Sequence, residues 1–324
     1  MGVVAVGPLK LENPYALAPM AGYGDPPFRR LCRRGGAGLV CAEMVSANAV
    51  FFGDKKSQRM LAVAPDEHPI SVQIFGAEPE RLAFAARRVE EAGADIVDLN
   101  CGCPVPKIVK GGAGISLMKD ETLFARCVEA MVKAVKIPVT VKMRLGFRRG
   151  ENLSRRFAVL ARESGASALC VHARAREDGR EGPPDLDALA ETAAASGLPV
   201  FGNGGVNSYQ DARRMMESSG CVGVMVGRAA VGNPLLFLEF LEEEKGERPG
   251  LTRNAAPRFS LLREHARLIV DYYGEKLGIC RLRKYIGSYI HGLYGAADFR
   301  RRAVGAVALD ELLGLIDRYE ASLG

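Results

Sequence analysis

Eight short apolar runs, most of which end in glycine or polar residues, constrain the fold of this chain more than any other feature of its sequence. They occupy residues 16–21, 39–45, 70–76, 96–102, 138–144, 168–174, 199–205 and 223–229. Runs of this length are typical of strands buried on both faces of a parallel sheet. Several gaps between them have helical periodicity, among them 79–92 and 120–136, and Ser208 has the sequence context of a helix N-cap. Eight strands that alternate with helices predict an α/β fold, a closed (β/α)8 TIM barrel.

The structural alternative is an open doubly wound sheet. Such sheets usually have fewer strands and carry a glycine-rich turn of the form G-x-G-x-x-G after the first one. Here the first run ends in Ala21-Gly-Tyr-Gly24 instead. The barrel therefore remains the prediction.

The sequence pattern changes after residue 239. Residues 242–250 are polar and close with Pro249 and Gly250, which is typical of a linker. From about residue 252 onward, apolar residues recur at helical spacing. Residues 251–302 include eleven basic and four acidic side chains, a net charge of +7, so the rest of the chain, whose total is +6, is near neutral. The sequence thus predicts two domains, a catalytic barrel over 1–245 and a basic all-helical domain over 246–324, and the local charge favours a nucleic-acid partner.

Composition excludes several other classes of protein. Hydrophobic residues make up 48% and charged residues 25% of the 324 residues, which is the balance of an ordinary globular chain. No run approaches the roughly 20 apolar residues of a membrane span, and residues 1–20 lack the pattern of an export signal, so we expect a cytoplasmic protein that does not bind a membrane. The eight cysteines are scattered, and neither they nor the four histidines have the spacing of metal ligands. We expect reduced thiols and no metal site.

The predicted strands end in an unusual number of polar side chains, and in a TIM barrel these ends form the active site. Lys142 and Arg144 lie two positions apart and so face the same way on a strand, as do His172 and Arg174. Taken singly, such a lysine is most often a solvated strand end, and a glycine there most often serves a turn. Together they place four basic side chains at one mouth, beside the glycine-rich ends of the last two runs, where barrels often hold a phosphate.

An ordered set of motifs then carries a resemblance to one enzyme family. The motifs are Ala18-Pro-Met-Ala-Gly22, Asp98-Leu-Asn-Cys-Gly-Cys-Pro104, Gly111-Gly-Ala-Gly114, Val141-Lys-Met-Arg144, His172-Ala-Arg174, Asn203-Gly204 and Val226-Gly-Arg-Ala229. In this order they resemble the flavin-dependent tRNA-dihydrouridine synthases over nearly the whole chain. The tail, with Tyr272-Tyr-Gly-Glu275 and Arg281-Leu-Arg-Lys-Tyr285, is similar to the helical RNA-binding domain of the bacterial B-type branch. The resemblance implies FMN as cofactor, NADPH or NADH as reductant, and reduction of specific uridines in tRNA to 5,6-dihydrouridine.

The resemblance also implies roles for individual residues. FMN would be bound by Pro19, Met20, Ala21, Gln73, Lys142, His172, Asn203, Gly204, Gly205, Gly227 and Arg228. RNA would be bound by Asn100, which orients the uracil, and by Arg144, Arg174, Arg281, Arg283 and Lys284. Hydride would pass from the flavin to uracil C6 while Cys103 protonates C5, a general-acid role that suits a thiol. The expected partner is tRNA, without DNA, and a monomer is the default expectation because the sequence does not reveal the oligomeric state.

The sequence departs from the family pattern at two places, and two other functions are alternatives to this interpretation. Cys101 adds a second thiol near Cys103, and residues 177–185 lack an aromatic side chain expected after the His-x-Arg motif. A flavin-dependent barrel acting on a small dihydropyrimidine-like substrate would explain the mouth but not the basic tail. A non-catalytic RNA-binding protein would explain the tail but not Cys103 together with Lys142.

Overall fold

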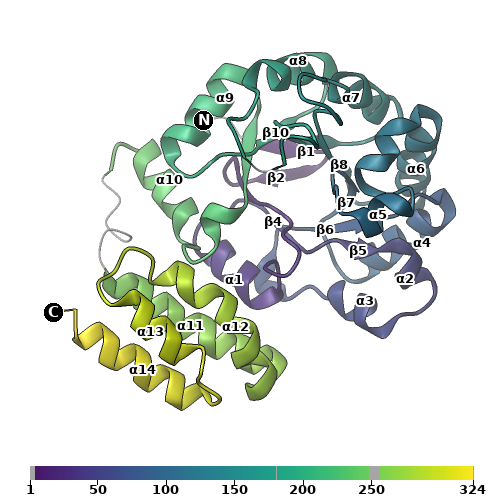
Figure 1. Ribbon diagram of the computed structural model, residues 1–324. Coiled ribbons are helices and arrows are strands. Elements are labelled where there is room, and N and C mark those ends of the chain that lie inside the picture. Colours follow the sequence, from purple (N-terminus) through teal and green to yellow (C-terminus); the bar gives the residue numbers. More distant parts are fainter. Residues whose placement is uncertain (1–3, 180, 248–254, 324) are drawn as a thin grey trace. The chain divides into compact units, whose positions relative to one another are not determined.

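Eight parallel strands close into a barrel (Figure 1) in the computed structural model, which describes residues 4–179, 181–247 and 255–323. The barrel strands are β3 (Tyr15–Leu17), β4 (Val40–Cys41), β6 (Ile70–Phe75), β7 (Ile96–Cys101), β8 (Val139–Arg144), β9 (Ala168–His172), β10 (Val200–Asn203) and β11 (Gly223–Val226). Each pairs with its neighbours in sequence order, and β11 pairs with β3. The circle is completed where the N–H of Leu17 donates to the carbonyl of Leu39 (2.8 Å), just before β4. The predicted TIM barrel is confirmed.

Several strands are shorter than the apolar runs that predicted them. The first run ends early because Pro19 has no N–H to continue the ladder, and the last such bond joins the N–H of Ala18 to the carbonyl of Val226 (2.7 Å). The second run, 39–45, is divided between β4 and the short strand β5 (Val45–Ser46), which pairs with β6. The residues freed from the ladders in this way become the loops of the barrel mouth.

Helices follow the strands along the chain and bury the outer side of the barrel. They are α2 (Ala47–Phe51), α3 (Lys55–Met60), α4 (Pro79–Glu91), α5 (Pro106–Lys110), α6 (Glu121–Ala134), α7 (Ser154–Glu163), α8 (Leu186–Ser196) and α9 (Tyr209–Ser219), with 3-10 turns η1 (Pro65–Glu67) and η2 (Gly114–Lys119). The two helices expected at 79–92 and 120–136 are present as α4 and α6. The predicted N-cap is also correct, because the Ser208 hydroxyl accepts the N–H of Asp211 (3.1 Å) at the start of α9.

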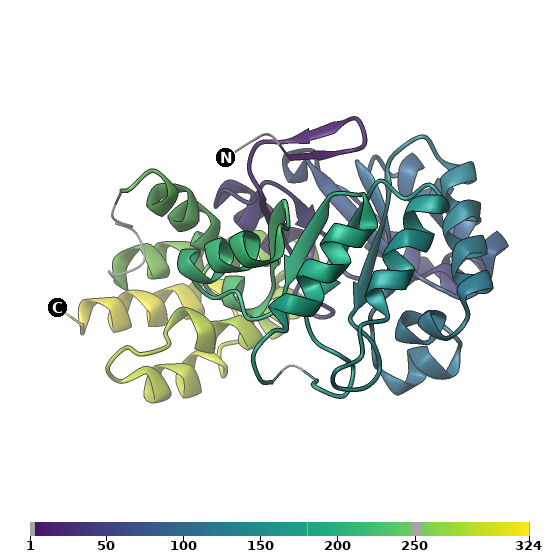
Figure 2. The same ribbon diagram turned by 90° about the horizontal axis from the view of Figure 1, so that it is seen from above.

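A hairpin that the sequence did not predict covers the end of the barrel where the strands begin (Figure 2). Its antiparallel strands are β1 (Val4–Val6) and β2 (Leu9–Leu11). Apolar side chains of both strands join the core inside the barrel, together with Ile96, Ala168 and Phe201. The hairpin closes this end with apolar surface, which leaves the opposite end, where the strands finish, as the open mouth.

The remaining helices form a second compact unit, which comprises Asp25–Gly36 and Arg228–Gly324. Its helices are α1 (Pro26–Arg34), α10 (Leu236–Glu244), α11 (Ala255–Tyr273), α12 (Glu275–Tyr289), α13 (Ala296–Ala303) and α14 (Leu309–Ala321), with a 3-10 turn η3 (Arg228–Ala230). Early in the sequence, α1 joins this unit through Phe28, whose ring lies 5.4 Å from that of Tyr285, and through an ion pair of Arg34 with Glu264.

The compact units divide the chain after Gly227, whereas the sequence placed the domain boundary after residue 245. Part of the predicted linker is helical, because α10 continues to Glu244; residues 248–250 lie outside the described part of the chain, as does the basic residue Arg253. Among the helices that the structure describes, none is both long and apolar enough to cross a membrane.

Candidate active site

Inward-facing residues of adjacent strands line up in three rows across the barrel, because paired residues of parallel strands point the same way. The first row is Gln73, Asp98, Thr140 and Ala168; the second is Asn100, Lys142, Cys170, Phe201 and Gly223; the third is Arg144, His172, Asn203, Met225 and Ala16. The register therefore brings six of the residues selected from the sequence, Gln73, Asn100, Lys142, Arg144, His172 and Asn203, to one end of the barrel.

Lys142 points into the barrel. Its Nζ donates a hydrogen bond to Oδ1 of Asn203 (2.8 Å), and Nδ2 of Asn203 donates to the carbonyl of Met225 (2.7 Å). The pKa of the neighbouring Cys170 thiol rises to about 11 because it is buried, and the charge of Lys142 limits this rise. Lys142 is thus a cation held in a fixed position at the mouth, not a solvated strand end.

Gln73 and Asn100 belong to one hydrogen-bonded cluster, and both are buried. Nδ2 of Asn100 donates to Oε1 of Gln73 (2.8 Å), and Oδ1 of Asn100 accepts the backbone N–H groups of Gly102 (3.2 Å) and Cys103 (2.9 Å). The second N–H of Asn100 points to the sulfur of Met44, 3.6 Å away, which is a weak acceptor. A carbonyl group of a ligand would bind this N–H better than the sulfur does.

Cys103 lies in the loop after β7 and is partly exposed. Its carbonyl accepts the N–H of Ile115 (3.2 Å), so the loop is tied to η2 as well as to Asn100. This contact requires a glycine at position 114. There φ is +63°, and a Cβ would lie 2.6 Å from the carbonyl oxygen of Cys103. The Gly111–Gly114 motif therefore serves to bring η2 against the cysteine loop.

The first cysteine of the motif, Cys101, faces away from the mouth. Along β7, Asp98 and Asn100 point inward, so Cys101 points outward to the helices. It is fully buried, and burial raises the pKa of its thiol well above the ordinary value, with a further contribution from Cys127 of α6. Cys101 is therefore a packing residue, and Cys103 is the cysteine placed to meet a ligand.

The turn after β3 forms another part of the mouth. The carbonyl of Met20 accepts the N–H groups of Tyr23 and Gly24 (2.9 Å each), which folds Pro19, Met20 and Ala21 over the end of the strand. Pro19 lines a small cavity inside the barrel together with Gln73. Gly227 lies beside this turn, since a Cβ there would be 3.6 Å from the sulfur of Met20. These residues present mainly apolar surface.

Glycines follow Asn203 where a side chain could not fit. At Gly204 φ is +113°, and a Cβ would lie 2.8 Å from Cδ2 of His172. At Gly205 φ is +72°, and a Cβ would lie 3.3 Å from Cδ of Pro184. The backbone after β10 thus comes close to the imidazole, as a loop that approaches a ligand through its main chain requires.

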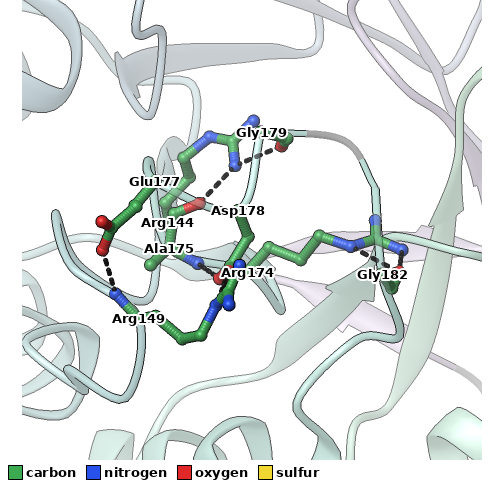
Figure 3. A network of polar contacts seen from close by, with 8 residues as sticks. All are labelled: Arg144, Arg149, Arg174, Ala175, Glu177, Asp178, Gly179 and Gly182. Carbon is green, nitrogen blue, oxygen red and sulfur yellow. Dashed lines mark hydrogen bonds and ion pairs between the residues drawn. The ribbon is translucent and has the colours of Figure 1, made fainter.

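Arg144 and Arg174, selected from the sequence as RNA-binding residues, are 5% exposed and hold a loop (Figure 3). Arg144 donates from Nη1 to the carbonyls of Ala175 and Gly179 (3.0 Å each), and its Nε donates to the carbonyl of Gly102 (3.2 Å). Arg174 donates to the carbonyl of Gly182 from Nε (3.1 Å) and Nη2 (2.5 Å). These contacts favour a role in ordering the loop after β9.

The same loop carries two acidic residues that bind Arg149. Asp178 accepts the N–H of Ala175 (2.9 Å) and Nε of Arg149 (2.8 Å), and Glu177 accepts the backbone N–H of Arg149 (2.9 Å). The guanidinium of Arg149 and the N–H of Ala175 lower the pKa of Asp178. The loop that follows His172 is thus tied both to the cysteine loop, through Arg144, and to the loop after β8.

The other selected residues belong to the second unit. Arg228 begins η3. On α12, the guanidinium of Arg281 lies over the ring of Tyr273 (4.3 Å), Nη2 of Arg283 donates to the carbonyl of Ala306 (3.3 Å), and Nζ of Lys284 lies over the ring of Tyr285 (4.9 Å). All three are partly buried. Their aliphatic stems pack within the unit, while α13 presents the exposed Arg300, Arg301 and Arg302.

Two residues inside the barrel, next to Gln73, were given no role from the sequence. Asp98 and Thr140 share the first row with Gln73. The Oγ1 hydroxyl of Thr140 donates a hydrogen bond to Oδ1 of Asp98 (2.6 Å). The signal that could have identified them is strand alternation, because Asp98 is two positions before Asn100 and Thr140 two before Lys142.

Comparison with known sequences identifies the family. A family model described as "Dihydrouridine synthase (Dus)" matches residues 16–320. The chain belongs to the dihydrouridine synthase family. The resemblance read from the motifs is therefore confirmed, as is the expectation of an enzyme. "tRNA-dihydrouridine synthase B" of Pseudomonas aeruginosa is 41% identical over 93% of this chain and 90% of its own length. A "probable tRNA-dihydrouridine synthase" of Rickettsia conorii is 39% identical over 95% of this chain and 92% of its own.

Solved structures support the fold alone. Histamine dehydrogenase from Rhizobium sp. 4-9 superposes with a TM-score of 0.60 at 16% identity, over 82% of this chain and 50% of the other. 6-Hydroxypseudooxynicotine amine oxidase from Pseudomonas geniculata N1 gives 0.59 at 15%, over 80% and 52%. The chain spans about half the length of these two proteins, and the likeness concerns its architecture.

Proposed function

We propose that this dihydrouridine synthase reduces specific uridines of tRNA to 5,6-dihydrouridine, with FMN as cofactor and NADPH or NADH as reductant. One observation carries the proposal. Lys142 and Asn100 are paired across β8 and β7, and Asn100 holds the backbone of Cys103, so that a fixed cation and a thiol lie at the same mouth. Relatives named tRNA-dihydrouridine synthase, which align over nine-tenths of the chain, support the choice of substrate.

The mouth has the groups that a flavin mononucleotide needs. Pro19 and Met20 offer apolar surface for a ring system, and Gln73 and Lys142 offer an amide and a cation for its polar edge. Gly204 and Gly205 have positive φ, and at Gly204 a Cβ would clash with His172, so this stretch presents main chain, which suits the close approach of a phosphate or ribityl chain. His172 and Asn203 complete this set, with Gly227 beside Met20 and Arg228 next along the chain.

When bound, FMN would supply the two electrons of the reduction. Lys142 would stabilise negative charge at the flavin edge, because its ammonium is already fixed by Asn203. Asn100 would orient the uracil by turning its N–H from the sulfur of Met44 to a uracil carbonyl. Cys103 would act as the general acid and give a proton from Sγ to C5. A uridine can reach this mouth only if it leaves its stack.

The basic residues of the second unit would bind the RNA backbone. A mouth that accepts one flipped base makes few phosphate contacts, whereas phosphate neutralisation dominates the affinity for nucleic acid. Arg281, Arg283 and Lys284 lie along α12. The ring of Tyr272, which is 43% exposed, packs edge-on against that of Tyr273, over which Arg281 lies. Such a surface, with cations next to aromatic rings, fits the backbone and bases of tRNA. This substrate would place the protein in the cytoplasm.

The decisive experiment compares dihydrouridine in total RNA from cells with the wild-type protein, with Cys103→Ala and with Cys101→Ala. The purified wild type should be yellow and should be bleached by NADPH or NADH. We expect Cys103→Ala to retain colour and bleaching but to form no dihydrouridine, and Cys101→Ala to form it. Loss of dihydrouridine from ribosomal RNA alone, or turnover of a free dihydropyrimidine without any change in RNA, would contradict the proposal.

A second variant tests the flavin site. Lys142→Ala should lower the flavin occupancy of the purified protein or the rate at which the flavin is reduced.

A further inference from the structure

A buried carboxylate lies inside the barrel, in the same row as Gln73 and two positions before Asn100 on β7. Asp98 is 7% exposed, and it lines the small cavity inside the barrel together with Pro19 and Gln73. Burial raises the pKa of this carboxyl, and hydrogen bonds from Gln73 and Thr140 and the charge of Lys142 act against the rise. Burying an ionisable group costs free energy unless it is well paired, and the function proposed above leaves Asp98 without a task.

Both carboxylate oxygens of Asp98 accept hydrogen bonds. Oδ1 accepts from the hydroxyl of Thr140 (2.6 Å), and Oδ2 accepts from Nε2 of Gln73 (2.7 Å). An ionised carboxylate can only accept. It therefore forces Gln73 to turn its NH2 group toward position 98 and its carbonyl oxygen toward Asn100.

The orientation of Gln73 determines that of Asn100. Oε1 of Gln73 needs a donor, which is Nδ2 of Asn100 (2.8 Å), and so Oδ1 of Asn100 must face the other way. There it accepts the backbone N–H of Cys103 (2.9 Å) and of Gly102 (3.2 Å). If Gln73 were reversed, Asn100 would present an NH2 group to these N–H groups, and donor would face donor.

We propose that Asp98 is a positioning residue, which sets the direction of the hydrogen-bonded relay Asp98–Gln73–Asn100–Cys103 and thereby fixes the cysteine loop and the two amides that face the ligands. The inference rests on the proposed function for its link to catalysis. Asp98 does not touch a reacting atom; it acts through Gln73 and Asn100. Thr140 bonds to the same carboxylate but lies outside the relay, which makes it a matched control.

The relay depends on an acceptor at position 98 and not on its negative charge. In Asp98→Asn the side-chain carbonyl can still accept from Gln73, while its NH2 group donates to the Thr140 hydroxyl, which is able to accept as well as donate. The direction of the relay is then kept. In Asp98→Ala, Gln73 has no acceptor and can turn. In Asp98→Asn combined with Thr140→Val, the NH2 group of the new asparagine has no hydroxyl at position 140 to which it can donate. It then competes with Asn100 for the side-chain carbonyl of Gln73.

The test uses the full-length protein in a Cys280→Ser background. Cys280 is exposed and Cys103 partly exposed, whereas the other six cysteines are buried. The rate of Cys103 alkylation by iodoacetamide then reports on the cysteine loop without reference to catalysis. We expect Asp98→Ala and the double variant to be alkylated at least threefold faster than the parent, and Asp98→Asn and Thr140→Val to stay within twofold of it.

Catalysis should follow the same order if the proposed function is correct. Asp98→Ala and the double variant should lose at least tenfold in kcat for dihydrouridine formation with KM for tRNA within twofold, and Asp98→Asn should restore most of the loss. The relay would be overturned if the double variant were alkylated at the same rate as Asp98→Asn. It would also be overturned if Asp98→Asn were alkylated as fast as Asp98→Ala. The first comparison remains valid even if Asp98→Ala does not fold. If the parent protein forms no dihydrouridine, the proposed function fails while the alkylation series still decides the relay.

Discussion

The stability of the second unit should depend on pH through one buried histidine, His265 of α11. Its ring is fully buried, 4.4 Å from the ring of Tyr285 and 6.0 Å from that of Phe28, and its Nδ1 lies 3.1 Å from the hydroxyl of Tyr289. Burial lowers the pKa of His265 from 6.5 to about 3, and the charge of Lys284 adds to the effect. The folded unit therefore holds the neutral imidazole.

The sign and size of the effect follow from proton linkage. Because the folded pKa lies below the unfolded one, the unfolded chain binds the extra proton first, and stability is lost as the pH falls from about 6.5 toward 3. With these two pKa values the loss between pH 7 and pH 5 is about 2 kcal/mol. For a urea m-value of about 2 kcal/mol/M, this contribution of His265 lowers the unfolding midpoint by roughly 1 M. Glu239 of the same unit acts in the opposite direction: burial raises its pKa to about 7, so the folded unit binds that proton first as the pH falls. The contribution of His265 is therefore the difference between the wild type and a variant without the imidazole.

Urea unfolding followed by tyrosine fluorescence measures this directly, because six of the nine tyrosines lie in the second unit and the chain has no tryptophan. His265→Asn keeps a polar partner near Tyr289 but cannot titrate, so between pH 7 and pH 5 its midpoint should fall by roughly 1 M less than that of the wild type. His291→Asn removes an exposed histidine of the same unit and serves as the control. Equal changes of the midpoint in the wild type and in His265→Asn would refute the reasoning.

Three further predictions concern the mouth and the RNA surface. Gly114→Ala should cost about 1–2 kcal/mol for its left-handed backbone and also abolish dihydrouridine formation, whereas Gly93→Ala, with φ of +88° and no atom near its Cβ, should cost as much by thermal unfolding and leave activity intact. Arg144→Ala should destabilise the protein by at least about 2 kcal/mol, since it removes three hydrogen bonds from a charged donor, and should expose residues 175–179 to limited proteolysis. The matched variant Arg149→Ala, at an exposed ion pair, should change neither the stability nor the cleavage. Equal cleavage in both variants would reject the loop-ordering role. Neutralising Arg281, Arg283 and Lys284 together should flatten the salt dependence of tRNA binding by about two units of slope in a filter-binding titration, without changing NADPH oxidation; if only neutralising Arg300, Arg301 and Arg302 does so, the RNA surface lies on α13.

Much of the barrel could be predicted from the sequence because its determinants are local. Apolar runs of strand length, the helical period of 79–92 and the cap at Ser208 each act through neighbours in the chain, and all appear in the structure. The N-terminal hairpin was missed because its two strands have three residues each, and their apolar side chains have meaning only against the base of the barrel. Helix α1 was not assigned to the second unit, because its partners Glu264 and Tyr285 lie more than 200 residues away.

The site shows the same division. The sequence by itself indicated which strand ends carry polar side chains, since strand alternation makes Lys142 and Arg144 point the same way. It did not predict that Cys101 faces outward, away from Cys103. Only the tertiary structure decided which hydrogen bonds these residues make. Lys142 donates to Asn203, and Arg144 donates to the carbonyls of Gly102, Ala175 and Gly179. Asp98 sets the direction of the side-chain amides of Gln73 and Asn100. Hydrogen bonds depend on distance and angle between groups far apart in the chain, and these are settled only when the barrel closes.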